Sequence, residues 1–327
     1  MRAVCHDRYG SPDVLHVREV DKPKPEAGEV RVRVRAAAVN PLDWHQVTGL
    51  PYIGRVSFGL PKPKQRVPGV DFAGQVEAVG KGVTRLQPGD EVFGGCKGAF
   101  GEYARASEKQ VAPKPGNLDF EHAAALPVAG ITALQALRDV GKVKRGQRVL
   151  INGAAGGVGT FAVQIAKSLG AEVTGVCSAR SVDLVRSIGA DDVIDYARED
   201  FTRDGRRYDL ILDNAGNHPL SELRRALSAD GTLISNSGRS EGRWIGAVDR
   251  VLKVKVVSPF VRERLRFFLS KLNYRDLMFL KEMAESQKVT PVIDRTFPLS
   301  QTAEAIAYVG TEHGRGKVVI AVDERER

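Results

Sequence analysis

A cluster of small residues, GAAGGVG at 153–159, joins an apolar run to a helical pattern. Glycines at such a bend allow a tight turn and let the backbone approach a pyrophosphate, which then meets free N–H groups at a helix N-terminus. Gly156 and Gly159 match the second and third glycines of a G-x-G-x-x-G pattern, and Ala154 occupies the first position. Such an imperfect pattern is also compatible with a purely structural turn. Its place between a predicted strand and a predicted helix favours a dinucleotide site.

The next predicted strand ends in CSARS at 177–181. It lacks the carboxylate that usually binds the ribose 2′-hydroxyl of NAD. Ser178, Arg180 and Ser181 instead supply hydroxyl groups and a cation, which suit a 2′-phosphate. We therefore predict NADPH rather than NADH as the cofactor. Ser178 is alternatively a helix N-cap, a role that it could share with phosphate binding.

The elements that position these residues alternate between strand and helix from about residue 121 onward. Alternation of this kind is typical of βαβ units and of a doubly wound parallel sheet. Residues 251–261, VLKVKVVSPFV, are expected to form a final, edge-like strand whose lysines discourage unwanted pairing. The other predicted strands of this sheet are 148–153, 172–178, 192–196, 208–216 and 231–238.

The first 115 residues have a β-rich pattern instead. EVRVRVRAAAVN at 29–40 alternates with a period of two, as a half-buried strand does. Residues 50–69, rich in Pro, Gly and Lys, are predicted to form a long surface loop. The C-terminal strand, helix and strand are expected to rejoin this β-rich region. The predicted domains are therefore 1–121 with 289–327, and 122–288.

Composition limits the class of protein. The 327 residues are 42% hydrophobic and 27% charged, which is typical of a globular protein with two domains. The sequence contains no apolar run of about 18 residues and no signal-peptide core, so we expect no membrane segment and a cytoplasmic location. The three cysteines lack the spacing of a disulfide framework or a structural zinc site. The net charge of +9 comes without a nucleic-acid motif, so nucleic-acid binding is not favoured.

Several longer segments together resemble the medium-chain dehydrogenase/reductase superfamily, specifically its zinc-free quinone oxidoreductase branch. The resemblance covers essentially the whole chain, and Ala154 is usual in this branch. It implies a GroES-like β-rich domain plus a Rossmann domain, with the active-site cleft between them. Its most specific segments are NPLDW at 40–44, PGVDFAGQVEAVG at 68–80, PGDEVFG at 88–94, AALPVAGITA at 124–133, GAAGGVGTFAVQIAK at 153–167 and GADDVIDY at 189–196.

Zinc-dependent relatives hold their catalytic metal with Cys, His and Cys. Here Asn40 stands at the first of these positions and Val70 at the second, while PVAGIT at 127–132 contains no thiol. A zinc site needs three protein ligands, so we expect none. Without a Lewis acid, a conjugated acceptor is the easier substrate, because the charge left by hydride addition spreads onto an oxygen. The resemblance implies the same substrates, namely quinones, alkenals and enones.

The resemblance also implies the cofactor contacts. Gly156, Gly157 and Val158 are expected at the pyrophosphate, and Lys317 at the cofactor phosphates. Tyr196 is alternatively a packing aromatic, Lys317 a solvated surface lysine, and Thr132 a helix residue bonded to its own backbone. The full set of predicted cofactor residues is Thr132, Ala155, Gly156, Gly157, Val158, Ser178, Arg180, Ser181, Tyr196, Asn214, Ala215, Ser235, Ser237, Phe260, Val261 and Lys317.

On the substrate side, the catalytic candidates are Asn40, Asp43 and Tyr52, with Trp44 as a possible wall. Asn40 and Asp43 are alternatively caps of the turn at NPLD, because Asn and Asp commonly bond their own backbone. Tyr52 is a candidate proton donor, although solvent could take that role and loop tyrosines often only pack.

Two other functions remain open from the sequence. One is an enoyl-thioester reductase on the same scaffold, and the other is a non-catalytic cofactor-sensing or RNA-binding protein. A homodimer joined through the last Rossmann strand, near residues 251–261, is expected from the resemblance.

Overall fold

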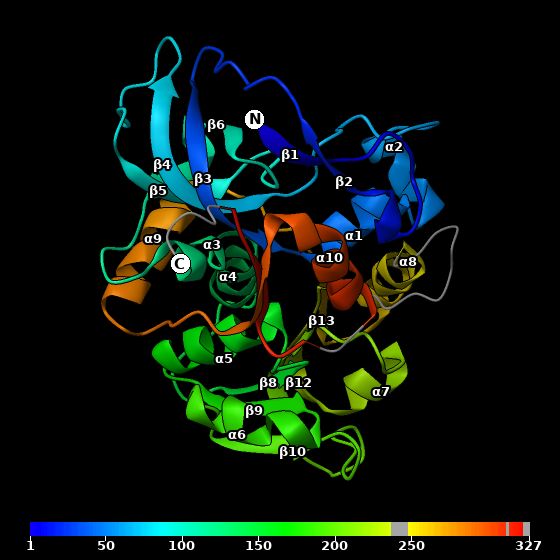
Figure 1. Cartoon of the computed structure of the whole chain (residues 1–327). Coiled ribbons are helices and arrows are strands. Elements are labelled where there is room, and N and C mark those ends of the chain that lie inside the picture. The colour runs from blue at the N-terminus through cyan, green and yellow to red at the C-terminus, as the bar shows by residue number, and fades with distance from the viewer. Residues whose placement is uncertain (237–247, 312–313, 323–327) are drawn as a thin grey trace. The chain divides into compact units, whose positions relative to one another are not determined.

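The computed structural model describes residues 1–236, 248–311 and 314–322 (Figure 1). The chain divides into two compact units. The terminal unit comprises residues 1–131 and 271–327, and the central unit comprises residues 132–270. The C-terminal tail thus joins the N-terminal region, as expected from its strand–helix–strand pattern. The predicted division assigned residues 122–131 and 271–288 to the other unit.

The terminal unit is built on a seven-stranded sheet with the order β14-β15-β3-β4-β5-β7, in which β6 also pairs with β3. The long strand β3 follows the alternation of its sequence, with Val30, Val32 and Val34 buried and exposed or half-buried arginines between them. The strands of this sheet are β3 Glu29–Val39, β4 Asp71–Val79, β5 Glu91–Gly95, β6 Tyr103–Ser107, β7 Val111–Pro113, β14 Ile293–Pro298 and β15 Lys317–Ala321.

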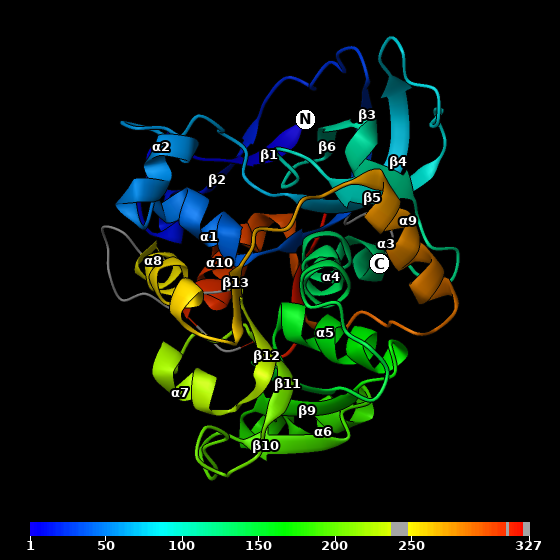
Figure 2. The same cartoon turned by 180° about the vertical axis from the view of Figure 1, so that it is seen from behind.

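Smaller elements complete the terminal unit. Strands β1 Arg2–Cys5 and β2 His16–Glu19 form a two-stranded antiparallel sheet. Helix α10, Thr302–Thr311, packs against α1, Pro41–Thr48, and both views show the pair together (Figures 1 and 2). Helix α9 spans Tyr274–Glu285. The segment at 120–140 is helical with a break just before Pro127: α3 spans Phe120–Ala124, α4 spans Pro127–Leu134 and a π-helix follows at Gln135–Val140.

Strand β15 brings residues from the two ends of the chain together. It pairs antiparallel with β3, and Val318 lies opposite Val39. This register sets Lys317, the first residue of β15, beside Asn40, which follows the last residue of β3. Residues 277 positions apart in sequence therefore share one end of the sheet.

The central unit is a six-stranded parallel sheet with the order β10-β9-β8-β11-β12-β13. The strand order reverses between β8 and β11, and in such sheets ligands bind outside the carboxyl ends of the strands at that point. The strands are β8 Arg148–Asn152, β9 Glu172–Cys177, β10 Asp192–Asp195, β11 Tyr208–Asp213, β12 Leu227–Ser235 and β13 Arg264–Phe267. The connecting helices are α5 Gly157–Ser168, α6 Val182–Ser187, α7 Leu220–Arg225 and α8 Val248–Val257.

The prediction of a strand at 251–261 is wrong. These residues form most of helix α8 and a 3₁₀ turn at Ser258–Phe260, and the edge strand is β13, which lies beside β12 (Figure 2). Val254 and Val257, three residues apart on α8, pack on the core, and Val261 packs there after the 3₁₀ turn. An apolar run broken by two lysines fits both a period of two and a helical period, and packing selects the helix.

The predicted loop at 50–69 also contains structure. It begins with a 3₁₀ turn at Tyr52–Gly54 and continues into the short helix α2, Arg55–Phe58. In the part of the chain that the structure describes, no helix is long and apolar enough to cross a membrane.

Candidate functional site

The glycine turn after β8 gives each glycine a separate task. Gly153 has a φ of 79°, a left-handed conformation that favours glycine. At Gly159 a Cβ would lie 2.1 Å from the carbonyl oxygen of Gly153, so only glycine permits this approach of helix to turn. At Gly156 a Cβ would meet only that same oxygen, at 3.5 Å. The absence of a side chain at Gly156 therefore leaves open space beside the turn, where helix α5 begins.

Helix α5 begins in this open space without a cap. Gly156 is its N-cap residue and offers no side-chain hydrogen bond, and the first turn contains no acidic residue. The first amide groups of a helix need partners from outside the helix and attract anions. Gly157 and Val158 are half-buried there, and Ala155 is buried. The turn thus fits a pyrophosphate, which stays a prediction.

The residues predicted at the 2′-phosphate lie together at the ends of two neighbouring strands. Asp195 pairs with Cys177, and the amide of Tyr196 donates to the Cys177 carbonyl at 3.1 Å. Ser178 and Tyr196, which follow these strand ends, are therefore neighbours. The Tyr196 side chain is 51% exposed, which argues against the packing alternative.

The hydroxyl groups of this cluster face one another. The Ser178 and Ser181 oxygens lie 3.4 Å apart, and Arg180 between them is exposed. Ser178 is the N-cap residue of the following 3₁₀ turn, as its alternative role proposed, but its hydroxyl makes no capping bond. Two hydroxyls and a guanidinium at one strand end are suitable donors for a phosphate.

A network that the sequence reasoning missed orders the loop after β11. The buried Asp213 carboxylate accepts hydrogen bonds from Asn152 Nδ2 at 2.8 Å and from the Gly216 amide at 3.0 Å. Asn152 Nδ2 also donates to Asn217 Oδ1 at 2.8 Å. The signal in the sequence is a polar residue that ends each of two apolar strands, LIN and LILD.

Two predicted cofactor residues hold buried polar atoms without a protein partner. Asn214 Nδ2 and Ser235 Oγ are buried and make no hydrogen bond among the described residues. Asn214 Oδ1 accepts a bond from Asn236 Nδ2 at 3.0 Å. Because buried polar groups normally have partners, these atoms fit the polar groups of a ligand. They lie at the carboxyl ends of β11 and β12, with Ala215 next to Asn214; Ser237 lies outside the described residues.

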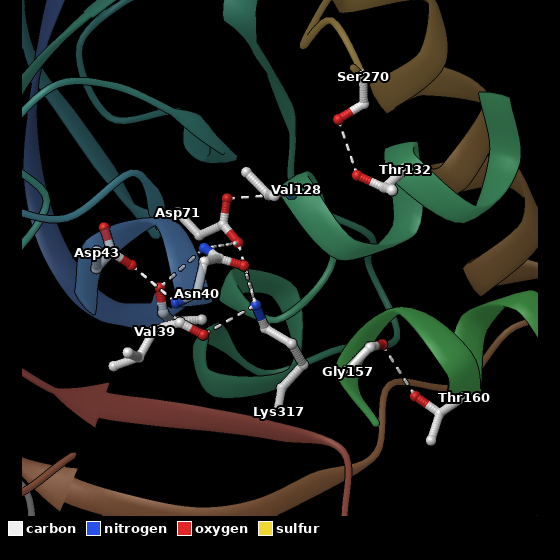
Figure 3. A network of polar contacts seen from close by, with 11 residues as sticks. Val39, Asn40, Asp43, Asp71, Val128, Thr132, Gly157, Thr160, Ser270 and Lys317 are labelled. Carbon is white, nitrogen blue, oxygen red and sulfur yellow. Dashed lines mark hydrogen bonds and ion pairs between the residues drawn. The ribbon is translucent and has the colours of Figure 1, made fainter. Parts of the chain in front are cut away.

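The remaining predicted cofactor residues of the central unit are less informative. Thr132 is buried, and its hydroxyl lies 2.8 Å from that of Ser270 (Figure 3). Phe260 is 85% exposed and Val261 is half-buried, both beyond the end of α8. Their cofactor contacts stay predictions.

Lys317 lies in a buried network in the terminal unit, shown in Figure 3. It is 3% exposed, which contradicts the alternative of a solvated surface lysine. Its ammonium donates to Asn40 Oδ1 at 2.6 Å and to the Val39 carbonyl at 3.2 Å, and lies 3.4 Å from Asp71 Oδ2. An ammonium has three N–H donors, and these three acceptors occupy them. These contacts give Lys317 a structural role, and its contact with the cofactor phosphates stays a prediction without support from them.

Asp71 is the centre of that network. Its Oδ2 accepts from Asn40 Nδ2 at 2.9 Å, and its Oδ1 accepts from the amide of Val128 in the first turn of α4 at 3.1 Å. The carboxyl is fully buried, which raises its pKa, while the charge of Lys317 and the bond from Asn40 oppose that rise. Asp71 thus links β4, the end of β3 and the start of α4.

Asn40 and Asp43 form the cap of helix α1, as the alternative reading of NPLD proposed. They make a capping box, in which the backbone N–H of Asn40 donates to Asp43 Oδ2 at 2.7 Å. Asn40 is buried, and both ends of its side-chain amide are bonded within the network. Asp43 is fully buried, and this burial raises its pKa to about 7. The structure thus gives both residues a structural role, and their catalytic role stays a prediction without support from these contacts.

Tyr52, the third catalytic candidate, is half-buried in the turn that follows α1. Its ring packs against the guanidinium of Arg55, whose Cζ lies 4.8 Å from the ring centroid. His45, on α1, holds the carbonyl of Leu50 at 2.7 Å through Nδ1, and its ring is in edge contact with Trp44. Burial lowers the pKa of His45, so its imidazole is neutral near pH 7.

Comparison with known proteins identifies the family. A family model described as the alcohol dehydrogenase GroES-like domain matches residues 26–116, and one described as zinc-binding dehydrogenase matches residues 188–320. The chloroplast envelope quinone oxidoreductase homolog of Arabidopsis thaliana is 33% identical over 337 residues, which cover 98% of each chain. The chain belongs to the quinone oxidoreductase family of medium-chain dehydrogenases/reductases.

Other members of the quinone oxidoreductase family support the same assignment. The quinone oxidoreductase from Coxiella burnetii has a solved structure with a TM-score of 0.85, at 31% identity and 99% coverage of both chains. An NADPH-dependent alkenal/one oxidoreductase of Arabidopsis thaliana is 32% identical over 98% of this chain and 79% of its own length. That relative is named as chloroplastic, so the cytoplasmic location of this chain stays a prediction. The GroES-like and Rossmann folds that the sequence predicted are those of the family.

Proposed function

We propose that this chain transfers a hydride from NADPH to a quinone or an α,β-unsaturated carbonyl compound without a catalytic zinc. The observation that carries this proposal is the open glycine turn at the uncapped start of α5. The serine–arginine cluster at the ends of β9 and β10 adds donors for a 2′-phosphate. The names of the relatives, a quinone oxidoreductase homolog and an NADPH-dependent alkenal/one oxidoreductase, support the substrates and the cofactor.

The central unit binds and orients the cofactor in this proposal. The amides of Gly157 and Val158 hold the pyrophosphate, and Ser178, Arg180 and Ser181 hold the 2′-phosphate beside Tyr196. Asn214 Nδ2 and Ser235 Oγ take up polar groups nearer the nicotinamide, because they are the buried atoms without partners. When bound, NADPH supplies the hydride. Lys317 is the predicted phosphate contact with the least support, because its ammonium is already bonded to Asn40 and Asp71.

The terminal unit supplies the substrate-side chemistry. After hydride addition to a conjugated acceptor, the negative charge spreads onto oxygen, where hydrogen bonds and a proton stabilise it. Tyr52 is the candidate proton donor, because Asn40 and Asp43 are buried in the helix cap. Protonation by solvent is the competing route.

The donor chemistry around Asn40 supports zinc independence. A lysine ammonium already lies against the Asn40 and Asp71 oxygens, and a divalent cation there would have to displace it. Asn40 offers an amide where zinc sites use thiolate, imidazole or carboxylate ligands. Among the described residues, no group of three His, Cys, Asp or Glu is arranged to hold a metal.

A test measures NADPH oxidation with a panel of quinones, enones and acyl-CoA enoyl thioesters. We expect turnover with quinones or enones, unchanged by a chelator, and a kcat/KM for NADPH well above that for NADH. Equal values for the two cofactors would contradict the 2′-phosphate assignment. Turnover with acyl-CoA substrates alone would select the enoyl-thioester reductase, and steeply salt-dependent RNA binding without turnover would select the non-catalytic alternative.

The quaternary structure in this proposal is a homodimer through the last strand of the parallel sheet. That strand is β13, whose outer edge has no strand partner in the described chain. An unpaired edge is a template for a second copy, which would extend the sheet across the two-fold axis.

A further inference from the structure

The turn that carries Tyr52 is held at both ends. It follows Gly49, the left-handed C-cap of α1, and ends at Gly59 after α2. The Tyr9 hydroxyl donates to the Gly59 carbonyl at 2.6 Å. At the other end, the Leu50 carbonyl bonds to His45 Nδ1 at 2.7 Å. The segment 49–59 is therefore anchored to α1 and to the N-terminal segment.

One side chain, Arg55, joins the centre of this segment to its first residue, Gly49, and to Tyr9 outside it. Its guanidinium carbon lies 4.4 Å from the ring centroid of Tyr9 and 4.8 Å from that of Tyr52. Its Nε donates to the Gly49 carbonyl at 3.0 Å. A planar guanidinium packs on aromatic faces while its edge donates hydrogen bonds, which an ammonium does less well. Arg55 thus contacts two phenol rings and the cap of α1 at once.

The Arg55 guanidinium and the rings of Tyr9 and Tyr52 form a stack. On the side of Gly49 there is no free space around this stack. A Cβ at Gly49 would lie 2.7 Å from Arg55 Nε and 2.7 Å from the Tyr9 ring. The backbone, the guanidinium and the ring are therefore in close contact, which limits the orientations open to Arg55. Because Arg55 is confined in this way, the face that it presents to Tyr52 is confined too.

We propose that Arg55 is a positioning residue for Tyr52. By packing on the ring, it fixes the direction of the Tyr52 side chain and so the place from which the hydroxyl donates its proton. Arg55 acts through Tyr52 and not on the substrate itself. This inference rests on the proposed function, in which Tyr52 protonates the reduced acceptor.

The test is a double-mutant cycle in kcat with an enone and saturating NADPH. The variants are Arg55→Gln, Tyr52→Phe and their combination; Tyr52→Phe keeps the ring but removes the hydroxyl. We expect Arg55→Gln to lower kcat by about tenfold, as for loss of a packed cation–aromatic contact, with an unchanged KM for NADPH. In the Tyr52→Phe background the same change is expected to have almost no effect. Arg55→Lys is expected to lie between wild type and Arg55→Gln.

The matched control is Arg66→Gln, which removes a nearby arginine that pairs with Asp7 and is outside the stack. It is expected to leave kcat unchanged. An equal loss of kcat from Arg55→Gln in both backgrounds would show that Arg55 acts independently of the Tyr52 hydroxyl and would overturn the inference.

A second measurement needs no turnover. Chymotrypsin cleavage after Tyr52 or Phe58 reports the order of the segment, and we expect Arg55→Gln to accelerate it while Arg66→Gln does not. Unchanged cleavage would overturn the positioning role. If the wild-type protein reduces no acceptor, the proposed function fails, and faster cleavage would still support the ordering of Tyr52 by Arg55.

Discussion

At the scale of single residues, the cluster around Lys317 is unusual because it buries three ionisable side chains together. Two carboxyl groups, Asp43 and Asp71, lie fully buried in the same region as one ammonium. Buried ionised groups are costly unless they are paired and hydrogen-bonded. Burial raises the pKa of both carboxyl groups, that of Asp43 to about 7, and the charge of Lys317 opposes the rise at Asp71.

The Asp43→Asn variant is predicted to change how stability depends on pH. The folded pKa of Asp43, about 7, lies above the unfolded value of about 3.9. The folded state therefore holds more protons between these values, so the contribution of Asp43 to stability is greatest at low pH and falls as pH rises toward 7. Denaturant unfolding measures the free energy of unfolding at pH 5 and at pH 8. From pH 5 to pH 8 this free energy is expected to fall less in the variant than in wild type, by up to a few kcal/mol. Identical pH profiles would show that Asp43 is ionised in the folded protein.

A second residue-scale prediction concerns the Lys317 pair. Lys317→Met removes the only ammonium bonded to Asp71 among the described residues and leaves a buried carboxylate unpaired. We expect a loss of about 3–5 kcal/mol in the free energy of unfolding. The double variant Lys317→Met with Asp71→Asn is expected to recover part of this loss, because no uncompensated charge remains. Losses that simply add would contradict the pairing.

At the scale of elements, two glycines in the turn from β8 into α5 have different roles, one in packing and one in the proposed binding of the cofactor. Gly159 permits close packing of the helix on the turn, whereas Gly156 borders open space. The sequence spacing indicated both positions but not which of them the fold itself requires.

Substitution of the two glycines by alanine is predicted to have different effects. Gly159→Ala places a Cβ 2.1 Å from the Gly153 carbonyl, so we expect a clear fall in Tm. Gly156→Ala has room in the protein alone, and its Tm is expected to change little while its affinity for NADPH falls at least tenfold. Thermal unfolding and calorimetric titration measure the two effects. Normal NADPH binding by a stable Gly156→Ala protein would argue against a pyrophosphate at this turn.

Comparison of predicted and observed elements shows which of them the sequence alone could predict. The alternation in β3 and the glycine bend were predicted correctly, because each depends on a local pattern. Helix α8 was assigned wrongly, since its apolar residues fit two periods and only packing against the sheet distinguishes them. The Asn40–Lys317 contact was beyond prediction, because it depends on the register between β15 and β3, which are far apart in sequence.

At the scale of the whole molecule, the edge of β13 that has no partner among the described strands carries exposed arginines at 264 and 266. A homodimer through this edge would bring these like charges close together across the two-fold axis. Salt screens such repulsion, with a Debye length of about 10 Å at 0.1 M ionic strength that shortens as salt rises. Sedimentation analysis is therefore expected to show a dimer whose dissociation constant falls as salt rises. A monomer at all protein and salt concentrations would contradict the proposed homodimer.

The position of β15 has a consequence for how this protein is made on the ribosome. It follows every other strand of its sheet in sequence, yet it lies between β14 and β3 and delivers the ammonium that pairs with Asp71. A nascent chain that has emerged only as far as residue 316 holds a buried acid without its counter-ion and a long strand with one open edge. Until residues 318–321 have emerged, the edge of β3 at residues 36–39 therefore lacks the strand that covers it in the folded protein.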